Sequence, residues 1–132
     1  MKAQAIFNKV VNHLRKQNKQ AIIPNSFVGY GATCQYRTID GLKCAAGALI
    51  QKSEYHPKME YNDIRYLLSE EQVKRGMTPK SMYDRLHPYV ELIVSLQNAH
   101  DGHNPSQWEP QFKRIAKEYH LKYIAPPKND KR

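Results

Sequence analysis

The stretch NPSQWEPQFKRIAKEY, residues 104–119, carries the clearest helix signal in the chain. Asn104 is a good N-cap, Pro105 suits the first turn because it has no amide hydrogen to leave unpaired, and Gln107 can return a hydrogen bond to the cap. After this start, one side of the expected helix is apolar and consists of Trp108, Phe112, Ile115, Ala116 and Tyr119. Helical spacing of apolar residues predicts an amphipathic helix packed against a core.

The same periodicity recurs on both sides of the region 20–60. Residues 3–17 place apolar side chains at helical spacing with lysines opposite them. Residues 64–76 predict one or two short helices that end at Gly76. Thr78 is expected to cap the next helix, and Pro88 is expected to divide the helical pattern that follows.

A short β element is expected earlier in the chain. Residues 27–38 contain β-type side chains in their second half, and Asp40-Gly41 is a strong turn signal. Residues 42–50 are rich in alanine, which favours helix and disfavours sheet. The sequence therefore predicts a mainly α (α+β) fold of five or six helices, with one short β strand or hairpin before an Ala-rich helix.

Length and composition indicate one small domain. The chain has 132 residues, of which 40% are hydrophobic and 25% charged, enough for one compact core without disulfides or metal. We expect residues 1–124 to form the domain and residues 125–132 a basic, disordered tail. No segment resembles a membrane span or a signal peptide, so we expect a cytoplasmic protein with reduced thiols and no membrane partner.

The formal net charge of +9 is concentrated at the two ends of the chain. Residues 1–20 contain basic side chains and no acidic ones, whereas the middle of the chain is nearly neutral. Clustered positive charge can steer a protein to phosphates or to an acidic partner, although solvated surface lysines give the same composition. The candidate residues for binding nucleic acid or a protein partner are Lys9, Arg15, Lys16, Lys19 and Lys122.

The densest group of chemically useful residues is the segment 34–47, CQYRTIDGLKCAAG. If a turn at Gly41 leads into a helix, free backbone amides would lie beside Arg37 and Lys43, an arrangement that can hold an anion. Tyr36, Arg37 and Lys43 are therefore candidate ligands for a nucleotide or another phosphate compound. The alternative is a plain turn with solvated charges, because the spacing matches no known phosphate-binding motif.

An enzyme is the third possibility and the least favoured. Cys44 near a helix start could act as a nucleophile, with His100 as base and Asp101 to orient it. Nothing in the sequence places these residues together, so we assign no catalytic residue. The cysteines and histidines lack the spacing of a zinc site, so we assign no metal and no cofactor. The simpler interpretation of residues 100–103 is a helix C-terminus with Gly102 in the left-handed conformation and His100 meeting the helix dipole.

Two motifs resemble small uncharacterised proteins encoded by tailed phages and prophages. The motifs are Cys34-x-Tyr36-Arg37 and the run GLKCAxGxLI at residues 41–50, with looser likeness at Tyr55, Met59-Glu60, Leu96-Gln97-x-x-His100-Asp101 and Trp108. The resemblance implies a viral accessory protein that binds a host factor in a bacterial cytoplasm, and it brings no catalytic residues. It also implies a glycine after Glu60, where this chain has Tyr61.

Overall fold

The computed structural model describes residues 2–23 and 33–126, and its architecture is mainly α, as predicted. The longer helices are α1 (Ala3–Gln17), α5 (Val90–Gly102) and α6 (Trp108–Glu118). Three shorter ones are α2 (Ile64–Leu67), α3 (Glu70–Lys74) and α4 (Lys80–Leu86). Single 3-10 turns lie at Gly47–Leu49 (η1), Pro57–Met59 (η2), His87–Tyr89 (η3) and Pro105–Gln107 (η4).

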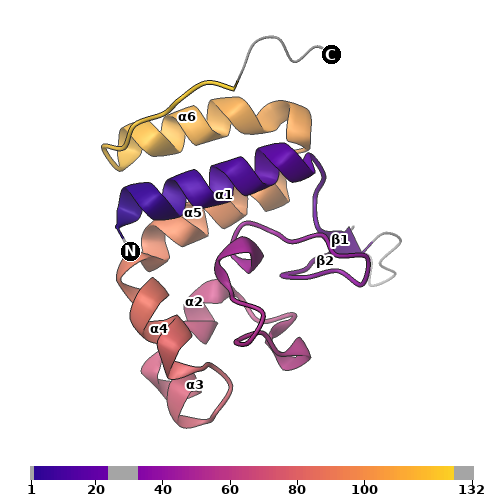
Figure 1. The fold of residues 1–132 in the computed structure, drawn as a ribbon, viewed down its shortest axis with the longest axis vertical. Coiled ribbons are helices and arrows are strands. Elements are labelled where there is room, and N and C mark those ends of the chain that lie inside the picture. Colours follow the sequence, from indigo (N-terminus) through magenta and orange to yellow (C-terminus); the bar gives the residue numbers. More distant parts are fainter. Residues whose placement is uncertain (1, 24–32, 127–132) are drawn as a thin grey trace.

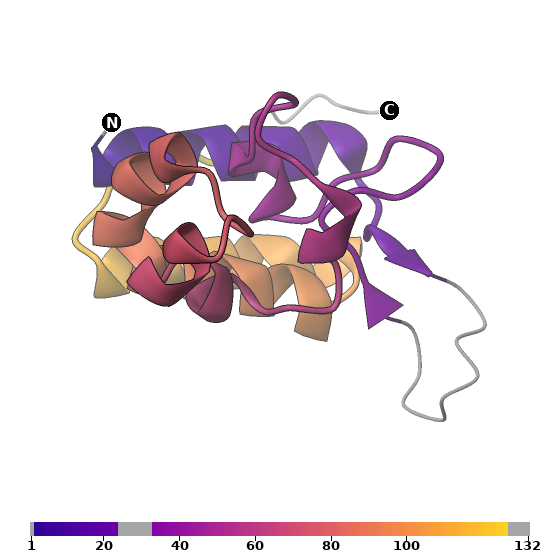
Figure 2. The same cartoon turned by 90° about the horizontal axis from the view of Figure 1, so that it is seen from below.

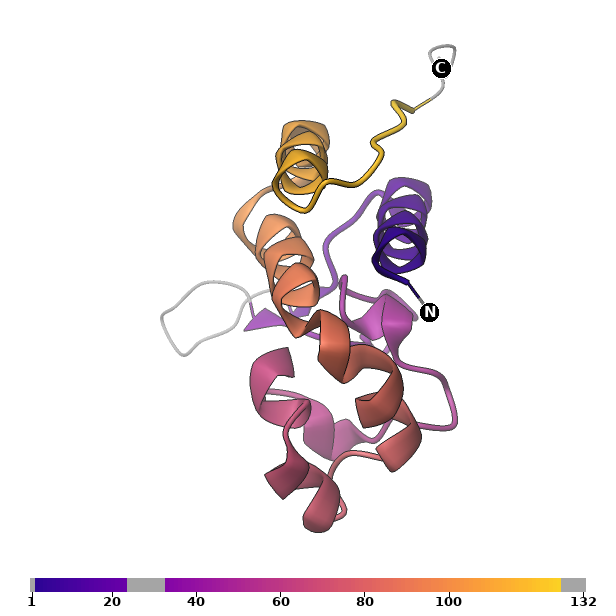
Figure 3. The same ribbon diagram turned by 90° about the vertical axis from the view of Figure 1, so that its left-hand side faces the viewer.

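The three longer helices form one side of the molecule, with α1 and α6 both packed against α5 (Figures 1 and 3). Apolar faces of all three helices meet in the core, as their spacing predicts. The fully buried side chains at this junction include Ile6, Val10, Leu14, Ile93, Leu96, Phe112 and Ile115. The short helices α2, α3 and α4 lie towards the other end of the molecule (Figure 1).

Sheet structure is minimal. Strands β1 (Ile22–Ile23) and β2 (Thr33–Cys34) pair antiparallel at one edge of the molecule, with Ile22 opposite Cys34 (Figure 2). Much of the predicted β element, residues 27–32, lies outside the described residues. After Cys34 the described residues form no further strand. One isolated β-bridge pairs the backbone of Arg37 with that of Lys43 across the turn at Gly41, whose φ is 91°.

The predicted Ala-rich helix over residues 42–50 is wrong. This segment contains turns and the single 3-10 turn η1. Its amides are taken by side chains from distant elements: Gln17 Oε1 accepts from Lys43 N at 2.9 Å, and Gln97 Oε1 accepts from Ala46 N at 2.8 Å. Its small residues serve close packing, since a Cβ on Gly47 would lie 2.0 Å from the Tyr36 carbonyl oxygen.

Several predicted helix boundaries agree with the structure, and one cap does not. Pro88 lies in the 3-10 turn that separates α4 from α5, and Gly76, with φ 81°, follows α3. The amide of Asn104 donates to Gln107 Oε1 at 3.1 Å ahead of α6. Thr78 does not cap α4, because its hydroxyl donates to the Leu67 carbonyl at 2.7 Å and the helix begins after Pro79.

Among the described residues, no helix has both the length and the apolar character that crossing a membrane requires. The predicted tail falls mostly outside the description, which ends at residue 126.

Candidate functional site

The segment 34–38 presents different side chains to two different cavities. The buried Glu60 carboxylate holds it in place by accepting from Tyr36 N at 3.0 Å, from Arg37 N at 3.1 Å and from the Tyr55 hydroxyl at 2.7 Å. Successive side chains of extended backbone point to opposite sides. Tyr36 therefore enters one cavity, together with Cys34, and Arg37 lines the other.

The cavity at Arg37 has a basic lining. It has a volume of about 360 Å³ and lies between α1, the Arg37–Lys43 bridge and residues 48–52. Among the residues that the structure describes, every ionisable side chain in its lining is basic. We call these residues the basic pocket: Lys9, His13, Arg37, Lys43 and Lys52.

Arg37 is fixed in the basic pocket without a carboxylate partner. Its Nη2 donates to the Ile50 carbonyl at 3.0 Å, and its guanidinium carbon lies 5.0 Å from the centre of the Tyr55 ring. Such a cation–π contact restrains the guanidinium and leaves its charge uncompensated. Within residues 2–23 and 33–126, Arg37 forms no ion pair, and its buried Nε has no hydrogen-bond partner.

Lys43 and His13 are held beside Arg37 by backbone contacts. Gln17 Nε2 donates to the Lys43 carbonyl at 2.9 Å, and His13 Nε2 lies 3.1 Å from the same oxygen. Burial lowers the pKa of Lys43, and the charges of Arg37 and Lys9 lower it further. Burial also lowers the pKa of His13, and the Lys43 charge adds to this. Like charges are thus crowded into one recess, which favours binding an anion.

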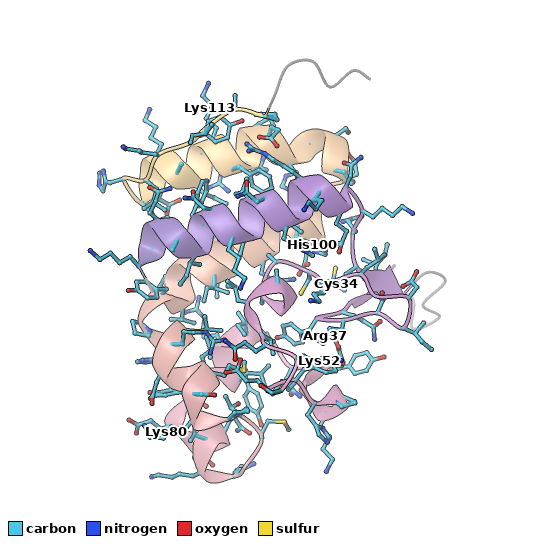
Figure 4. The ribbon with its side chains drawn as sticks, viewed as in Figure 1. Cys34, Arg37, Lys52, Lys80, His100 and Lys113 are labelled. Atoms are coloured by element: carbon cyan, nitrogen blue, oxygen red, sulfur yellow. The ribbon has the colours of Figure 1, made fainter. Side chains whose placement is uncertain are left out.

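The other cavity, which we call the sulfur cavity, has a volume of about 550 Å³. Its lining includes Cys34, Tyr36, Cys44 and Asp101. Cys34, Asp101 and the buried His100 bring one potential metal-ligating atom each within 4.8 Å of one another. Figure 4 shows Cys34 close to His100, and Arg37 close to Lys52 at the basic pocket.

Both nitrogens of His100 are already engaged. Nε2 accepts from the backbone N–H of Ala21 at 3.0 Å, and Nδ1 lies 2.7 Å from Asp101 Oδ1. Because the Ala21 amide can only donate, the neutral ring carries its proton on Nδ1 and donates it to Asp101. No lone pair of His100 is left to deprotonate a thiol or to bind a metal ion.

The thiols are also unsuited to nucleophilic attack. Burial raises the pKa of Cys44 to about 12. It also raises the pKa of Cys34, and the Asp101 carboxylate raises it further. A catalytic thiol needs a lowered pKa, so this geometry does not support the Cys/His enzyme. The predicted cap at residues 100–103 is wrong as well, since Gly102 ends α5 without a positive φ and the His100 ring is turned into the core.

The structure places two of the three predicted ligand residues, Tyr36, Arg37 and Lys43, next to each other. Arg37 and Lys43 share the basic pocket, whereas Tyr36 is buried on the other side and its hydroxyl contacts the Asn62 carbonyl. The expected cradle of free amides after Gly41 is wrong. Leu42 N donates to Thr38 Oγ1 at 2.9 Å, and the amides of Lys43, Ala46 and Gly47 donate to Gln17, Gln97 and the Cys44 sulfur.

The predicted basic surface is divided by the fold. Lys9 lines the basic pocket, and Lys16, Lys19 and Lys122 are exposed. Arg15 is engaged elsewhere, because its Nη2 and Nε each lie 2.8 Å from a Glu109 oxygen and thereby join α1 to α6. Arg15 therefore has a structural partner for its charge.

Two members of the basic pocket were missed by sequence reasoning. His13 follows Lys9 by one helical turn, a spacing that places both on one face of α1 and could have identified it. Lys52 carries no such signal, since only the turn at η1 brings it to the pocket. Comparison of the chain with protein-family models, with curated proteins and with solved structures finds no match.

Proposed function

We propose that this protein acts by binding rather than by catalysis, and that its basic pocket engages a phosphate-bearing partner, for which nucleic acid is the preferred candidate. The observation that carries the proposal is the pocket lining, in which lysine, arginine and histidine side chains from three chain segments converge, with no carboxylate from the described part of the chain among them. If the positive charge served only to keep the surface solvated, basic side chains from three segments would not be expected to gather in one pocket.

The neighbouring surface supports the same proposal. Lys16 lies two helical turns after Lys9 on α1, and both side chains are exposed. A nucleic-acid backbone presents one phosphate after another, so cations outside the pocket can contact phosphates next to the one inside it. An acidic host protein, the other partner class considered, does not require a recessed cluster of arginine and lysine.

The proposed setting is the one implied by the sequence resemblance: a small phage-type accessory protein in a bacterial cytoplasm. In that setting the partner would be host or viral nucleic acid. Among the described residues, both thiols have a raised pKa, and both ring nitrogens of the neighbouring His100 are engaged, which favours binding over a thiol-based enzymatic role.

The experiment is a salt titration of binding with a charge-matched control. Fluorescence anisotropy of a labelled single-stranded oligonucleotide is measured with the natural chain, with Lys9→Glu/Lys52→Glu, and with Lys113→Glu/Lys117→Glu on α6. All four lysines are exposed, so both variants change the net charge equally with little effect on folding.

We expect affinity to fall by an order of magnitude or more between ~50 mM and ~200 mM salt. The pocket variant should lose about tenfold or more relative to the α6 variant at the same salt. Equal losses in the two variants would mean that only net charge matters. An affinity that does not change with salt concentration, or no binding at low salt, would contradict the proposal.

A further inference from the structure

We propose that the basic pocket is a receptor for a terminal phosphate group, a phosphomonoester, rather than for the phosphodiesters within a strand. The inference rests on the proposed function, because it concerns the same pocket, and it specifies the chemical class of the group that enters. The shared chemistry has two sources, the phosphorylated end of a nucleic-acid strand and a small phosphorylated ligand.

The shape of the pocket favours a chain end. Its volume of about 360 Å³ accommodates a phosphate and the group attached to it, and it is walled by α1, by the Arg37–Lys43 bridge and by residues 48–52. A phosphodiester within a strand has two substituents, so the strand extends from it on both sides and fits an open basic surface. A phosphomonoester has one substituent, so it can enter a recess while the rest of the ligand stays outside.

The charge of the pocket matches a dianion. A terminal phosphate carries between one and two negative charges near neutral pH and three acceptor oxygens, whereas a diester carries one charge. The lining supplies the ammonium groups of Lys9, Lys43 and Lys52 and the guanidinium of Arg37. Hydrogen bonds between ionised partners are the stronger kind, and several can form to one phosphate.

Arg37 is oriented before any ligand arrives. The Ile50 carbonyl and the Tyr55 ring restrain its guanidinium, and Glu60 holds the backbone at the same residue. The Glu60 carboxylate is occupied by backbone amides and the Tyr55 hydroxyl, and it forms no ion pair with Arg37. Arg37 therefore offers an uncompensated, positioned donor, which reduces the entropy lost on binding.

The first arm of the test compares two oligonucleotides that differ only at the 5′ end, one phosphorylated and one with a free hydroxyl. We expect the phosphorylated strand to bind the natural chain about tenfold more tightly at equal salt, the gain of one good charge-assisted contact. Lys43→Gln and Lys52→Gln should each reduce this preference, and Lys113→Gln should retain it. Two separate pocket variants guard against one of them failing to fold.

The second arm measures thermal unfolding with a nucleoside 5′-monophosphate, with inorganic phosphate and with chloride at matched ionic strength. A rise in Tm with the two phosphates, absent with chloride and absent in Lys43→Gln, supports the site for a small ligand even if the two strands bind equally. Equal binding of the strands together with no phosphate-specific rise overturns the inference. If salt-sensitive strand binding survives that result, the proposed function stands without it.

Discussion

Tyr61 combines an unfavourable backbone conformation with an exposed side chain. Its φ is 68°, and 75% of its surface is accessible at the rim of the sulfur cavity. The left-handed region costs a non-glycine residue about 1 kcal/mol or more, and glycine adopts it freely. The conformation at position 61 is therefore the one for which glycine is suited.

We expect Tyr61→Gly to stabilise the protein by about 0.5–1 kcal/mol, since relief of strain exceeds the added freedom of the unfolded chain. Urea denaturation measures the change in the free energy of unfolding. Tyr66→Gly is the matched control: Tyr66 is also exposed but lies within α2, where glycine should destabilise by up to about 1 kcal/mol. Destabilisation by both variants would mean that the Tyr61 ring makes a contribution of its own.

At the scale of residues, the sequence grouped two charges that the fold also brings together, and it misjudged their neighbours. Arg37 and Lys43 were found because they flank a glycine turn, and that turn places them in one pocket. Tyr36 was grouped with them by proximity in sequence, although alternation along extended backbone sends it to the opposite side. His100 was assigned to a helix end, and its burial depends on the amide of Ala21, which no local pattern reveals.

At the scale of elements, Arg85 joins α4 to the segment that walls the basic pocket. Its Nη2 donates to the Leu49 carbonyl at 2.8 Å, and its guanidinium pairs with the buried carboxylate of Glu54, with a closest distance of 2.7 Å. Burial by itself would raise the pKa of Glu54, but hydrogen bonds from Arg85, the Gln51 backbone and Ser81 lower it to about 2.

We expect Arg85→Ala to destabilise the protein by about 3–5 kcal/mol near pH 7, because it leaves a buried carboxylate unpaired. Since the folded pKa of Glu54 is lowered, the stability that the pair contributes is complete above the ordinary pKa of 4.5 and is lost as pH falls towards about 2. Urea denaturation near pH 7 and at acid pH should therefore show a smaller difference between the two proteins in acid. An equal difference at both pH values would contradict this role for Glu54.

The elements that the sequence predicted well are those whose signal is local. Helices α1 and α6 carry their apolar spacing within their own residues, and both lie where that spacing places them. Residues 42–50 have helical composition, but Gln17 and Gln97 supply acceptors that replace helical hydrogen bonds. Such tertiary contacts override helix propensity, which is worth only tenths of a kcal/mol per residue.

At the scale of the whole molecule, the basic pocket exists only in the folded chain. Lys9, Arg37 and Lys52 belong to separate segments, and the packing of α1 against η1 brings Lys9 to the same pocket as the other two. The fold thus brings basic side chains that are distant in the sequence into one pocket. Arg15 shows the reverse case, since the same packing takes a basic side chain out of the surface and pairs it with Glu109.

The Cys44 thiol can report on the integrity of this packing. Cys44 is 1% exposed, its Sγ accepts from Gly47 N at 3.3 Å, and its pKa is about 12. In a Cys34→Ser variant, alkylation of Cys44 then requires an opening of the core. For a domain of ordinary stability this slows the reaction by a factor of about 10³ or more relative to the unfolded chain, where the thiol is free.

We therefore expect iodoacetamide at neutral pH to label Cys44 of this variant immediately in concentrated urea and very slowly in buffer. Mass spectrometry measures both rates, and a phosphate-containing ligand that binds the basic pocket should slow labelling in buffer further, because binding to the folded state lowers the population of open molecules. Rapid labelling in buffer would show that the core around residues 44–47 opens independently of the rest. It would also reopen the question of a reactive thiol, since attack at neutral pH requires an accessible thiolate.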